Sequence, residues 1–249
     1  MPAEQVLGCR SSRLYPWGLH QGRHVRPPWA GQDDRLAYSA SCTFLFDGRP
    51  DISPPRLLLL DFDGVLADFH RPTLVTQLAR QLDRDAAVVE AALHRAAARP
   101  STAGALPWQR LGEQLQQALG AEQWLQARLA ATSLRQECRW LLQQLRGNCA
   151  LAVLSNNPQL LAEPIAQALA LPGLDASRVL TSGALGLRKP DPACFQRALQ
   201  QLEGEPASTL FIDNLFVNVR GARAAGLMAD TAHHTQSLRR VLRRFGLLR

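Results

Sequence analysis

The sequence predicts an α/β fold, in which a parallel sheet lies between two layers of helices and a helical insert follows the first strand. Short apolar runs typical of buried strands alternate along the chain with longer stretches of helical periodicity. Three of these runs stop at polar residues, namely Asp61, Ser155 and Asp213. Ligands of open α/β sheets bind outside the carboxyl ends of the strands, so the three endings predict one shared site.

The first strand is predicted at residues 57–60, a run of four leucines. An uninterrupted apolar run is typical of a strand that is buried on both faces. Asp61 and Asp63 follow it, and on a regular strand they would share a face and repel each other. Gly64 allows a sharp turn here, because glycine adopts positive φ without strain. The pattern favours a Mg²⁺-dependent carboxylate site; an acidic pair before glycine also occurs in ordinary turns.

Residues 70–145 are predicted to form a helical cap between the first and second strands. Leucines recur there at i+4 spacing, as expected for the buried face of a helix. The leucines concerned are Leu74, Leu78 and Leu82, followed by Leu111, Leu115 and Leu119. We expect the last helix, at about residues 133–145, to start at the N-cap Ser133, to end at Gly147 and to return the chain to the core.

The core is predicted from residues 56–69 and 146–249. Asn157 and Pro158 suit the N-cap and first position of a helix, and Pro192 suits the start of another. The other elements expected here are strands at residues 151–154, 209–212 and 228–232, and helices at residues 158–170 and 192–203. Alternation of strands and helices predicts a three-layer, Rossmann-like arrangement with a parallel sheet.

The last helix is amphipathic and basic. Leu238, Val241, Leu242 and Phe245 share one face, and arginines occupy the other. This pattern is more typical of a helix that closes the core with a solvated arginine face than of a nucleic-acid or membrane helix. We therefore expect neither nucleic acid nor a membrane as a partner.

Residues 1–55 differ from the rest of the chain in composition. They contain both tyrosines, two of the tryptophans and scattered proline, glycine and arginine, without sustained periodicity. We expect a mostly disordered N-terminal extension, or a start codon assigned too early. Two alternatives are a segment that packs on the body and a binding arm with tryptophan and arginine anchors.

The overall composition indicates a globular protein with free thiols. Apolar residues make up 46% of the chain and the formal net charge is +7. The five cysteines are scattered without C-x-x-C spacing, which favours a reducing, cytoplasmic location, and no apolar run approaches a membrane span. Lys189 is the only lysine, and it lies in the Lys189-Pro190-Asp191-Pro192 loop rather than in a helix.

Four motifs occur in a fixed order. They are LLLLDFDGV at residues 57–65, LAVLSN at residues 151–156, KPDP at residues 189–192 and TLFIDN at residues 209–214. Taken together, they resemble the haloacid dehalogenase (HAD) superfamily from residue 56 to about residue 235. The closest pattern is that of the subfamily I phosphatases with a small helical cap. The sequence departs from it at Asn214, where the family often has a second aspartate.

The resemblance implies roles for the carboxylates. Asp61 would be the nucleophile that forms an aspartyl-phosphate, and its other oxygen would bind Mg²⁺. Asp63 would protonate the leaving group, then deprotonate the hydrolytic water, and its main-chain carbonyl would contact the metal. Asp213 would be the second carboxylate ligand of Mg²⁺.

The same resemblance implies roles for the neighbouring polar residues. Ser155 and Asn156 would donate hydrogen bonds to the phosphoryl oxygens, and Lys189 would neutralise both those oxygens and Asp61. Asn214 and Asn218 would orient Asp213 or the water molecules on the metal, without binding the metal themselves.

The function expected is hydrolysis of a small phosphate monoester, a sugar phosphate or similar metabolite. A dehalogenase would not need Asp63, because a leaving halide takes no proton. The alternatives are a phosphosugar mutase of the same superfamily and a degenerate HAD-like binding protein. Within the cap, the candidate specificity groups are Arg95, Arg99, Trp108 and Arg110.

Overall fold

A computed structural model describes residues 53–98, 106–146 and 149–249. The chain divides into two units, 1–50 and 51–249, and every described residue belongs to the second. Residues 1–52 of the predicted N-terminal extension, Arg99 and Gly147 lie outside the described residues.

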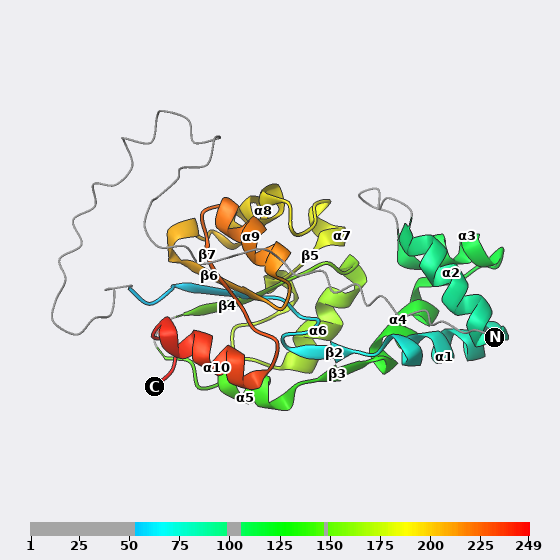
Figure 1. The fold of residues 1–249 in the computed structure, drawn as a ribbon, viewed down its shortest axis with the longest axis horizontal. Coiled ribbons are helices and arrows are strands. Elements are labelled where there is room, and N and C mark those ends of the chain that lie inside the picture. Colours follow the sequence, from blue (N-terminus) through cyan, green and yellow to red (C-terminus); the bar gives the residue numbers. More distant parts are fainter. Residues whose placement is uncertain (1–52, 99–105, 147–148) are drawn as a thin grey trace, which may run out of the picture. The chain divides into compact units, whose positions relative to one another are not determined.

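The described core contains a five-stranded parallel sheet in the order β5-β4-β1-β6-β7 (Figure 1). The strands are β1 (Leu57–Leu60), β4 (Ala150–Ser155), β5 (Val179–Thr181), β6 (Thr209–Asp213) and β7 (Met228–Thr231). A separate antiparallel ribbon pairs β2 (Ala67–Phe69) with β3 (Thr132–Leu134). This arrangement confirms the predicted α/β class with a parallel sheet.

The leucines of β1 pack into the apolar clusters on both faces of the sheet. Leu58 and Leu60 belong to one apolar cluster, and Leu57 and Leu59 belong to another. The first cluster contains residues of α5 (Gln136–Leu142), α6 (Ala162–Leu169) and α10 (Thr235–Arg244). The second contains residues of α7 (Ser182–Leu185), α8 (Pro192–Leu202) and α9 (Phe216–Ala224). Because successive side chains of a strand point to opposite faces, a run of leucines is what a strand between two helical layers requires.

Figure 1 shows these layers, with α8 and α9 on one side of the sheet and α5 and α10 on the other. The helices of the core are α5 (Gln136–Leu142), α6 (Ala162–Leu169), α7 (Ser182–Leu185), α8 (Pro192–Leu202), α9 (Phe216–Ala224) and α10 (Thr235–Arg244). Short 3-10 turns cover Gln159–Leu161, Ala176–Arg178 and Pro206–Ser208.

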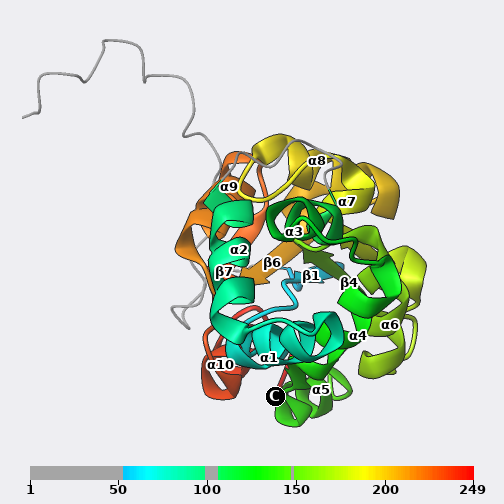
Figure 2. The same cartoon turned by 90° about the vertical axis from the view of Figure 1, so that its right-hand side faces the viewer.

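The insert contains α1 (Arg71–Leu82), α2 (Ala86–Ala98), α3 (Pro107–Leu115) and α4 (Ala121–Ala130). Figure 2 shows α1 next to α4 and α2 next to α3, and these pairs are in contact. The leucines that predicted the insert are buried, from Leu74 in α1 to Leu119 after α3. Trp108 and Trp124 stack at a tilt, with ring centroids 5.8 Å apart.

Two local predictions are wrong. Ser133 does not cap a helix, since it pairs with Asp68 in the β2–β3 ribbon and α5 begins only at Gln136. Asn157 and Pro158 do not open α6, which begins at Ala162 after a 3-10 turn. The side chain of Asn157 is not a cap because it is bonded to other polar groups described below.

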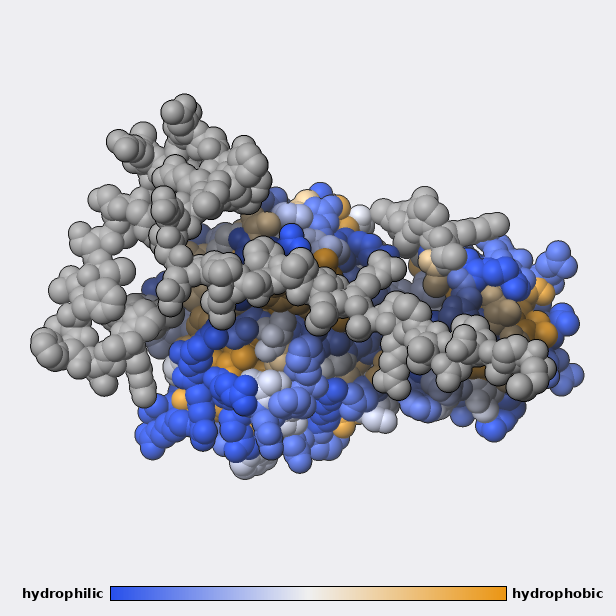
Figure 3. Space-filling model, in the orientation of Figure 1, coloured by the Kyte–Doolittle hydropathy of each residue, from blue (hydrophilic) through white to orange (hydrophobic). Residues whose placement is uncertain are grey.

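The C-terminal helix packs as expected. Leu238, Val241 and Leu242 of α10 are buried, while Arg239 and Arg240 are exposed. Figure 3 shows a hydrophilic surface in the region of α10 and α5. Within the described residues, no helix is long and apolar enough to cross a membrane. Cys138, Cys149 and Cys194 are free thiols, and burial raises the pKa of Cys149 and of Cys194 to about 11.

Gly221 of α9 is expected to be intolerant of any side chain. An added Cβ would lie less than 3.0 Å from the carbonyl oxygen of Pro190, the residue after Lys189. Glycine to alanine inside a helix normally stabilises by about 0.5–1 kcal/mol. Here we expect Gly221→Ala to destabilise by about 1–3 kcal/mol through overpacking, measured by urea unfolding.

The matched control is Ala224→Ser, which adds one atom at an exposed position of the same helix. It should change the unfolding free energy by no more than about 0.5 kcal/mol. A stabilised Gly221→Ala protein would show that α9 does not press against the Lys189 loop.

Candidate active site

Lys189 joins the ends of two neighbouring strands. Its Nζ lies 2.8 Å from Asp61 Oδ1 and 2.7 Å from Asp213 Oδ2. Asp61 follows β1 and Asp213 ends β6, so parallel pairing of β1 with β6 brings the two carboxylates together. All three side chains are buried, and each carboxylate would be costly there without the ammonium group.

The ionised form of Asp61 is disfavoured in the folded protein. Burial raises its pKa from 3.8 to about 6; Lys189 opposes this effect and Asp213 adds to it. The main-chain nitrogen of Asp61 donates to the Ile212 carbonyl at 2.9 Å, which extends the β1–β6 pairing by one residue. The carboxylate is therefore held in place on a rigid element of the core.

Asp213 is the most enclosed of these carboxylates. Its Oδ1 accepts a hydrogen bond from Leu215 N at 2.8 Å. Its Oδ2 accepts from Asn218 Nδ2 at 3.0 Å as well as from Lys189. Asn218 thus orients Asp213, the contact that its predicted role requires.

Gly64 and Asn214 pack directly against each other. Gly64 has φ +86°, and an added Cβ would lie less than 3.0 Å from the Asn214 side chain. Asn214 Oδ1 is buried and has no hydrogen-bond partner within the described structure. A buried carbonyl oxygen without a partner is unfavourable unless something binds it, so this oxygen is free to receive a cation or a water molecule.

The residues present fit Mg²⁺. Two carboxylates, Asp61 and Asp213, and the orphaned oxygen of Asn214 supply hard oxygen donors, and Mg²⁺ binds few carboxylates and keeps several water molecules. Among the described residues, no three acidic, histidine or cysteine side chains converge on one point. The side chain of Asp63 is held elsewhere, so its part in metal binding rests on its main-chain carbonyl and stays a prediction.

Asn156 holds the loop that carries Lys189. Its Nδ2 donates to the Lys189 carbonyl, and its Oδ1 accepts from Lys189 N, both at 3.0 Å. Ser155 at the end of β4 is buried, and its Oγ accepts a hydrogen bond from Asn157 Nδ2 at 2.7 Å. The oxygen of the Asn156 side chain and one hydrogen of its amide group are used by the main chain of Lys189. Only the second amide hydrogen is therefore available for the predicted bond to a phosphoryl oxygen.

Asp63 is held by two side chains for which the sequence predicted no role in the site. Both of its oxygens accept hydrogen bonds from Arg128 NH2 at 2.7 Å, and Oδ2 also accepts from Asn157 Nδ2 at 2.8 Å. Arg128 lies in α4 of the insert and is buried. A single contact therefore joins a helix of the insert to the loop after β1.

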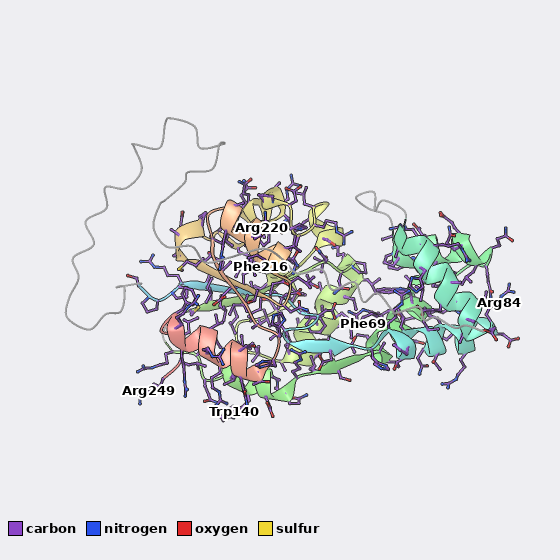
Figure 4. All side chains as sticks on the ribbon, viewed as in Figure 1. Phe69, Arg84, Trp140, Phe216, Arg220 and Arg249 are labelled. Carbon is purple, nitrogen blue, oxygen red and sulfur yellow. The ribbon has the colours of Figure 1, made fainter. Side chains whose placement is uncertain are left out.

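Arg128 has further partners in the insert. Its guanidinium lies 4.2 Å from the centroid of the Phe69 ring, and it donates to Thr132 Oγ1. Figure 4 shows Phe69 at the end of β2, where the chain enters the insert. The sequence predicted only that Arg128 lies within the helical cap, and it carried no signal for a contact with Asp63.

Arg135 was also missed. It donates to the Gly64 carbonyl at 2.8 Å and to the His233 carbonyl at 3.0 Å, and it pairs with Asp68 Oδ1 at 2.5 Å. The same pairing lowers the pKa of Asp68. Arg135 thereby ties the β2–β3 ribbon to the loop that carries Asp63 and to the segment after β7.

Comparison with known proteins identifies the family. Residues 55–226 match the family of haloacid dehalogenase-like hydrolases. The chain belongs to this family. It is 26% identical over 188 residues to a phosphoglycolate phosphatase of Pseudomonas putida, covering 70% of this chain and 67% of that protein. It is 38% identical over 85 residues to a phosphatase of Mycobacterium tuberculosis, covering 34% of this chain and 39% of that protein.

Solved HAD structures share the fold. A HAD-like hydrolase of Porphyromonas gingivalis aligns with a TM-score of 0.60 at 20% identity, over 77% of this chain and 99% of that chain. A HAD enzyme of Bacteroides thetaiotaomicron, solved with magnesium and inorganic phosphate, aligns at 0.57 with 16% identity, over 71% and 93%. The L-2-haloacid dehalogenase RSc1362 aligns at 0.55 with 18% identity, over 77% and 100%. The HAD family and its fold were thus correctly predicted, and the Bacteroides thetaiotaomicron enzyme of this fold was solved with magnesium bound.

The raised pKa of Asp61 predicts a pH-dependent stability in the metal-free protein. A carboxyl with a folded pKa of about 6 and an ordinary value of 3.8 stabilises the fold most at low pH and loses that contribution as pH rises through 6. We expect the unfolding free energy of wild type, relative to Asp61→Asn, to fall by on the order of 1–3 kcal/mol between pH 4 and pH 7.

Urea unfolding in EDTA at several pH values measures this difference. Asp68→Asn is the control, because the pKa of exposed Asp68 is lowered rather than raised, so its trend has the opposite sign. A wild-type minus Asp61→Asn difference that stays constant from pH 4 to pH 7 would contradict the raised pKa.

Proposed function

We propose that this protein is a Mg²⁺-dependent phosphatase that hydrolyses a small phosphate monoester through an aspartyl-phosphate on Asp61. The observation that carries the proposal is Lys189 held between Asp61 and Asp213, with Asp63 two residues after the nucleophile. The relatives named as phosphatases support the same reaction class.

The first step needs a nucleophile in line with the phosphorus atom. An oxygen of Asp61 attacks phosphorus, a new O–P bond forms and the bond to the leaving oxygen breaks. Asp63 supplies the proton that the leaving alkoxide takes. In the second step Asp63 removes a proton from water, which attacks phosphorus and releases inorganic phosphate and free Asp61.

The remaining residues stabilise charge and hold positions. Lys189 neutralises the phosphoryl oxygens, and Asn156 fixes the main chain on both sides of its amide, so the ammonium is positioned before substrate arrives. The Ser155 hydroxyl can donate to a phosphoryl oxygen while accepting from Asn157. Asn218 and Leu215 N keep the carboxylate of Asp213 fixed.

Magnesium would be held by Asp61, Asp213, the main-chain carbonyl of Asp63 and, on the evidence of its orphaned oxygen, Asn214. It would supply positive charge that the phosphoryl group needs as negative charge builds up on its oxygens. The direct use of Asn214 departs from the role inferred from sequence, in which Asn214 only orients other groups.

The choice of phosphatase over dehalogenase rests on Asp63. The fold does not separate the two activities, because a dehalogenase aligns as well as the phosphate-bound hydrolase does. An alkoxide leaving group needs a proton and a halide does not, and this chain keeps a carboxylate at residue 63 with two dedicated hydrogen-bond donors.

Asp61→Asn should abolish phosphatase turnover, because it removes the nucleophile and a metal ligand together. Release of inorganic phosphate from a panel of phosphorylated metabolites and from p-nitrophenyl phosphate, with Mg²⁺ and with EDTA, measures this. We expect a loss greater than about 10²-fold in the variant and a comparable loss of wild-type activity in EDTA.

Asp68→Asn serves as the control, since this exposed carboxylate on β2 pairs with Arg135 and with no other described side chain. This variant should retain activity within a few-fold. Retention of more than about a tenth of the wild-type rate by Asp61→Asn, against the ~10²-fold that a missing catalytic group typically costs, would exclude the covalent mechanism.

Arg128 should act on the reaction through Asp63. Arg128→Met removes both hydrogen bonds to this carboxylate, so it should slow esters whose leaving group needs a proton more than those whose leaving group does not. We expect kcat/KM to fall on the order of 10²-fold for an alkyl phosphate and only a few-fold for p-nitrophenyl phosphate, as for Asp63→Asn.

Arg128→Lys should recover part of the alkyl phosphatase activity, and Arg128→Met should add little loss in an Asp63→Asn background. Equal losses for the two esters would mean that Arg128 acts through the folding of the insert and not through the acid.

A further inference from the structure

A cavity of about 530 Å³ lies between the insert and the core, next to the phosphoryl site. Asn156 and Asn157 line it, and these two residues bind the main chain of Lys189 and the side chains of Ser155 and Asp63. Anything that occupies this cavity therefore lies beside the reacting phosphoryl group. A volume in this range suits a small metabolite.

The cavity is unevenly charged. Arg71, Arg110 and Arg188 line it, and Asp191 is the acidic residue that lines it within the described chain. The Asp191 carboxylate accepts a hydrogen bond from Ala193 N at the start of α8, which partly compensates its negative charge. Arg110 donates a hydrogen bond to the Ala96 carbonyl.

Arg71 carries a donor without a partner. Its Nε donates to Glu90 Oε1 at 2.9 Å, but its buried NH2 atom has no hydrogen-bond partner in the described structure. Glu90 also lies 2.9 Å from His94 Nε2, so this carboxylate is shared. The Arg71 side chain is 40% exposed and lines the cavity, so its guanidinium group lies within reach of a ligand there.

Arg188 precedes Lys189 in the chain and is exposed on the opposite, core side of the cavity. Its side chain has no hydrogen bond or ion pair with another described residue. The remaining wall on the insert side is apolar, formed by Leu93, Ala97 and Leu106. The cavity thus combines an apolar wall with arginine donors on two sides.

We propose that this cavity binds the leaving group of the substrate, and that the leaving group carries a second anion, a carboxylate or a phosphate, next to an apolar body. Arg71 and Arg188 bind the anion, and Leu93 and Leu106 contact the body. Guanidinium groups suit this task because they bind planar anions in bidentate fashion. The inference rests on the proposed phosphatase function and specifies its substrate class.

The test compares paired esters that differ by one carboxylate, phenyl phosphate and 4-carboxyphenyl phosphate, with Mg²⁺. Wild type should prefer the carboxylated ester by roughly 10- to 100-fold in kcat/KM, the strength of a charge-assisted hydrogen bond. Arg71→Met and Arg188→Met should each reduce this preference about tenfold or more.

Arg84→Met is the matched control. Arg84 follows α1, donates to Gln117 Oε1 and lies outside the cavity, at the end of the insert shown in Figure 4. This variant should keep the wild-type preference. Should Arg71→Met fail to fold, the exposed Arg188 carries the test, and Arg71→Lys should keep part of the preference.

Calorimetry separates failure of the subsite from failure of the proposed function. Benzylphosphonate and 4-carboxybenzylphosphonate do not react, so their affinities report the subsite even if no ester is hydrolysed. The proposal is overturned by equal kcat/KM for the two esters together with equal affinities for the two phosphonates, or by a preference that survives both Arg71→Met and Arg188→Met. Absence of turnover with a retained preference among the phosphonates would overturn the phosphatase function alone.

Discussion

The arrangement of the candidate site depends on the contact between Lys189 and the carboxylates of Asp61 and Asp213. Asp61 and Asp213 end adjacent strands of a closely packed sheet, where two negative charges could not remain side by side without a cation. Nearby structure serves this contact: Asn156 holds the lysine main chain, and Asn218 holds Asp213. Gly221 leaves room for the loop that delivers the ammonium. Even with the lysine present, Asp61 keeps a raised pKa, so its ionised form lowers the stability of the fold.

The insert is connected to this centre through arginines, each by a different contact. Arg128 reaches Asp63 from α4, and Arg135 binds the carbonyls of Gly64 and His233 from the residue after β3. Arg71 starts α1 and borders the cavity beside the phosphoryl site. Movement of the insert would change the surroundings of the proposed acid and of the leaving group together. Substrate binding and proton transfer would then depend on one arrangement of the insert.

The sequence predicted the parts of the site that local rules control. The leucine run, the polar strand endings and the isolated lysine predicted that Asp61, Ser155, Lys189 and Asp213 share one site. The sequence did not reveal Arg128 or the contacts of Asn157, which lie 65 and 94 residues from Asp63. The contact of Arg128 depends on how the insert folds back, and that of Asn157 depends on the pairing of β1 with β4. The β2–β3 ribbon was missed for a similar reason, since three-residue strands carry too little periodicity to compete with a neighbouring helix signal. Asn157 looked like a helix cap because its local sequence suits one, but its longer-range partners determine its position.

The scarcity of lysine has a consequence for the chemistry of the whole chain. The side chain of Lys189, the one ε-amine in the sequence, is 1% exposed and committed to two carboxylates. In the folded protein, reagents and enzymes that modify lysine therefore meet no accessible side-chain amine. Acylation of Lys189 requires the centre to open, so the rate at which an amine-reactive compound labels that position reports how often Asp61 and Asp213 release their shared cation. Labelling of this single lysine therefore measures the opening of the site, because amine-reactive compounds do not label the surface arginines.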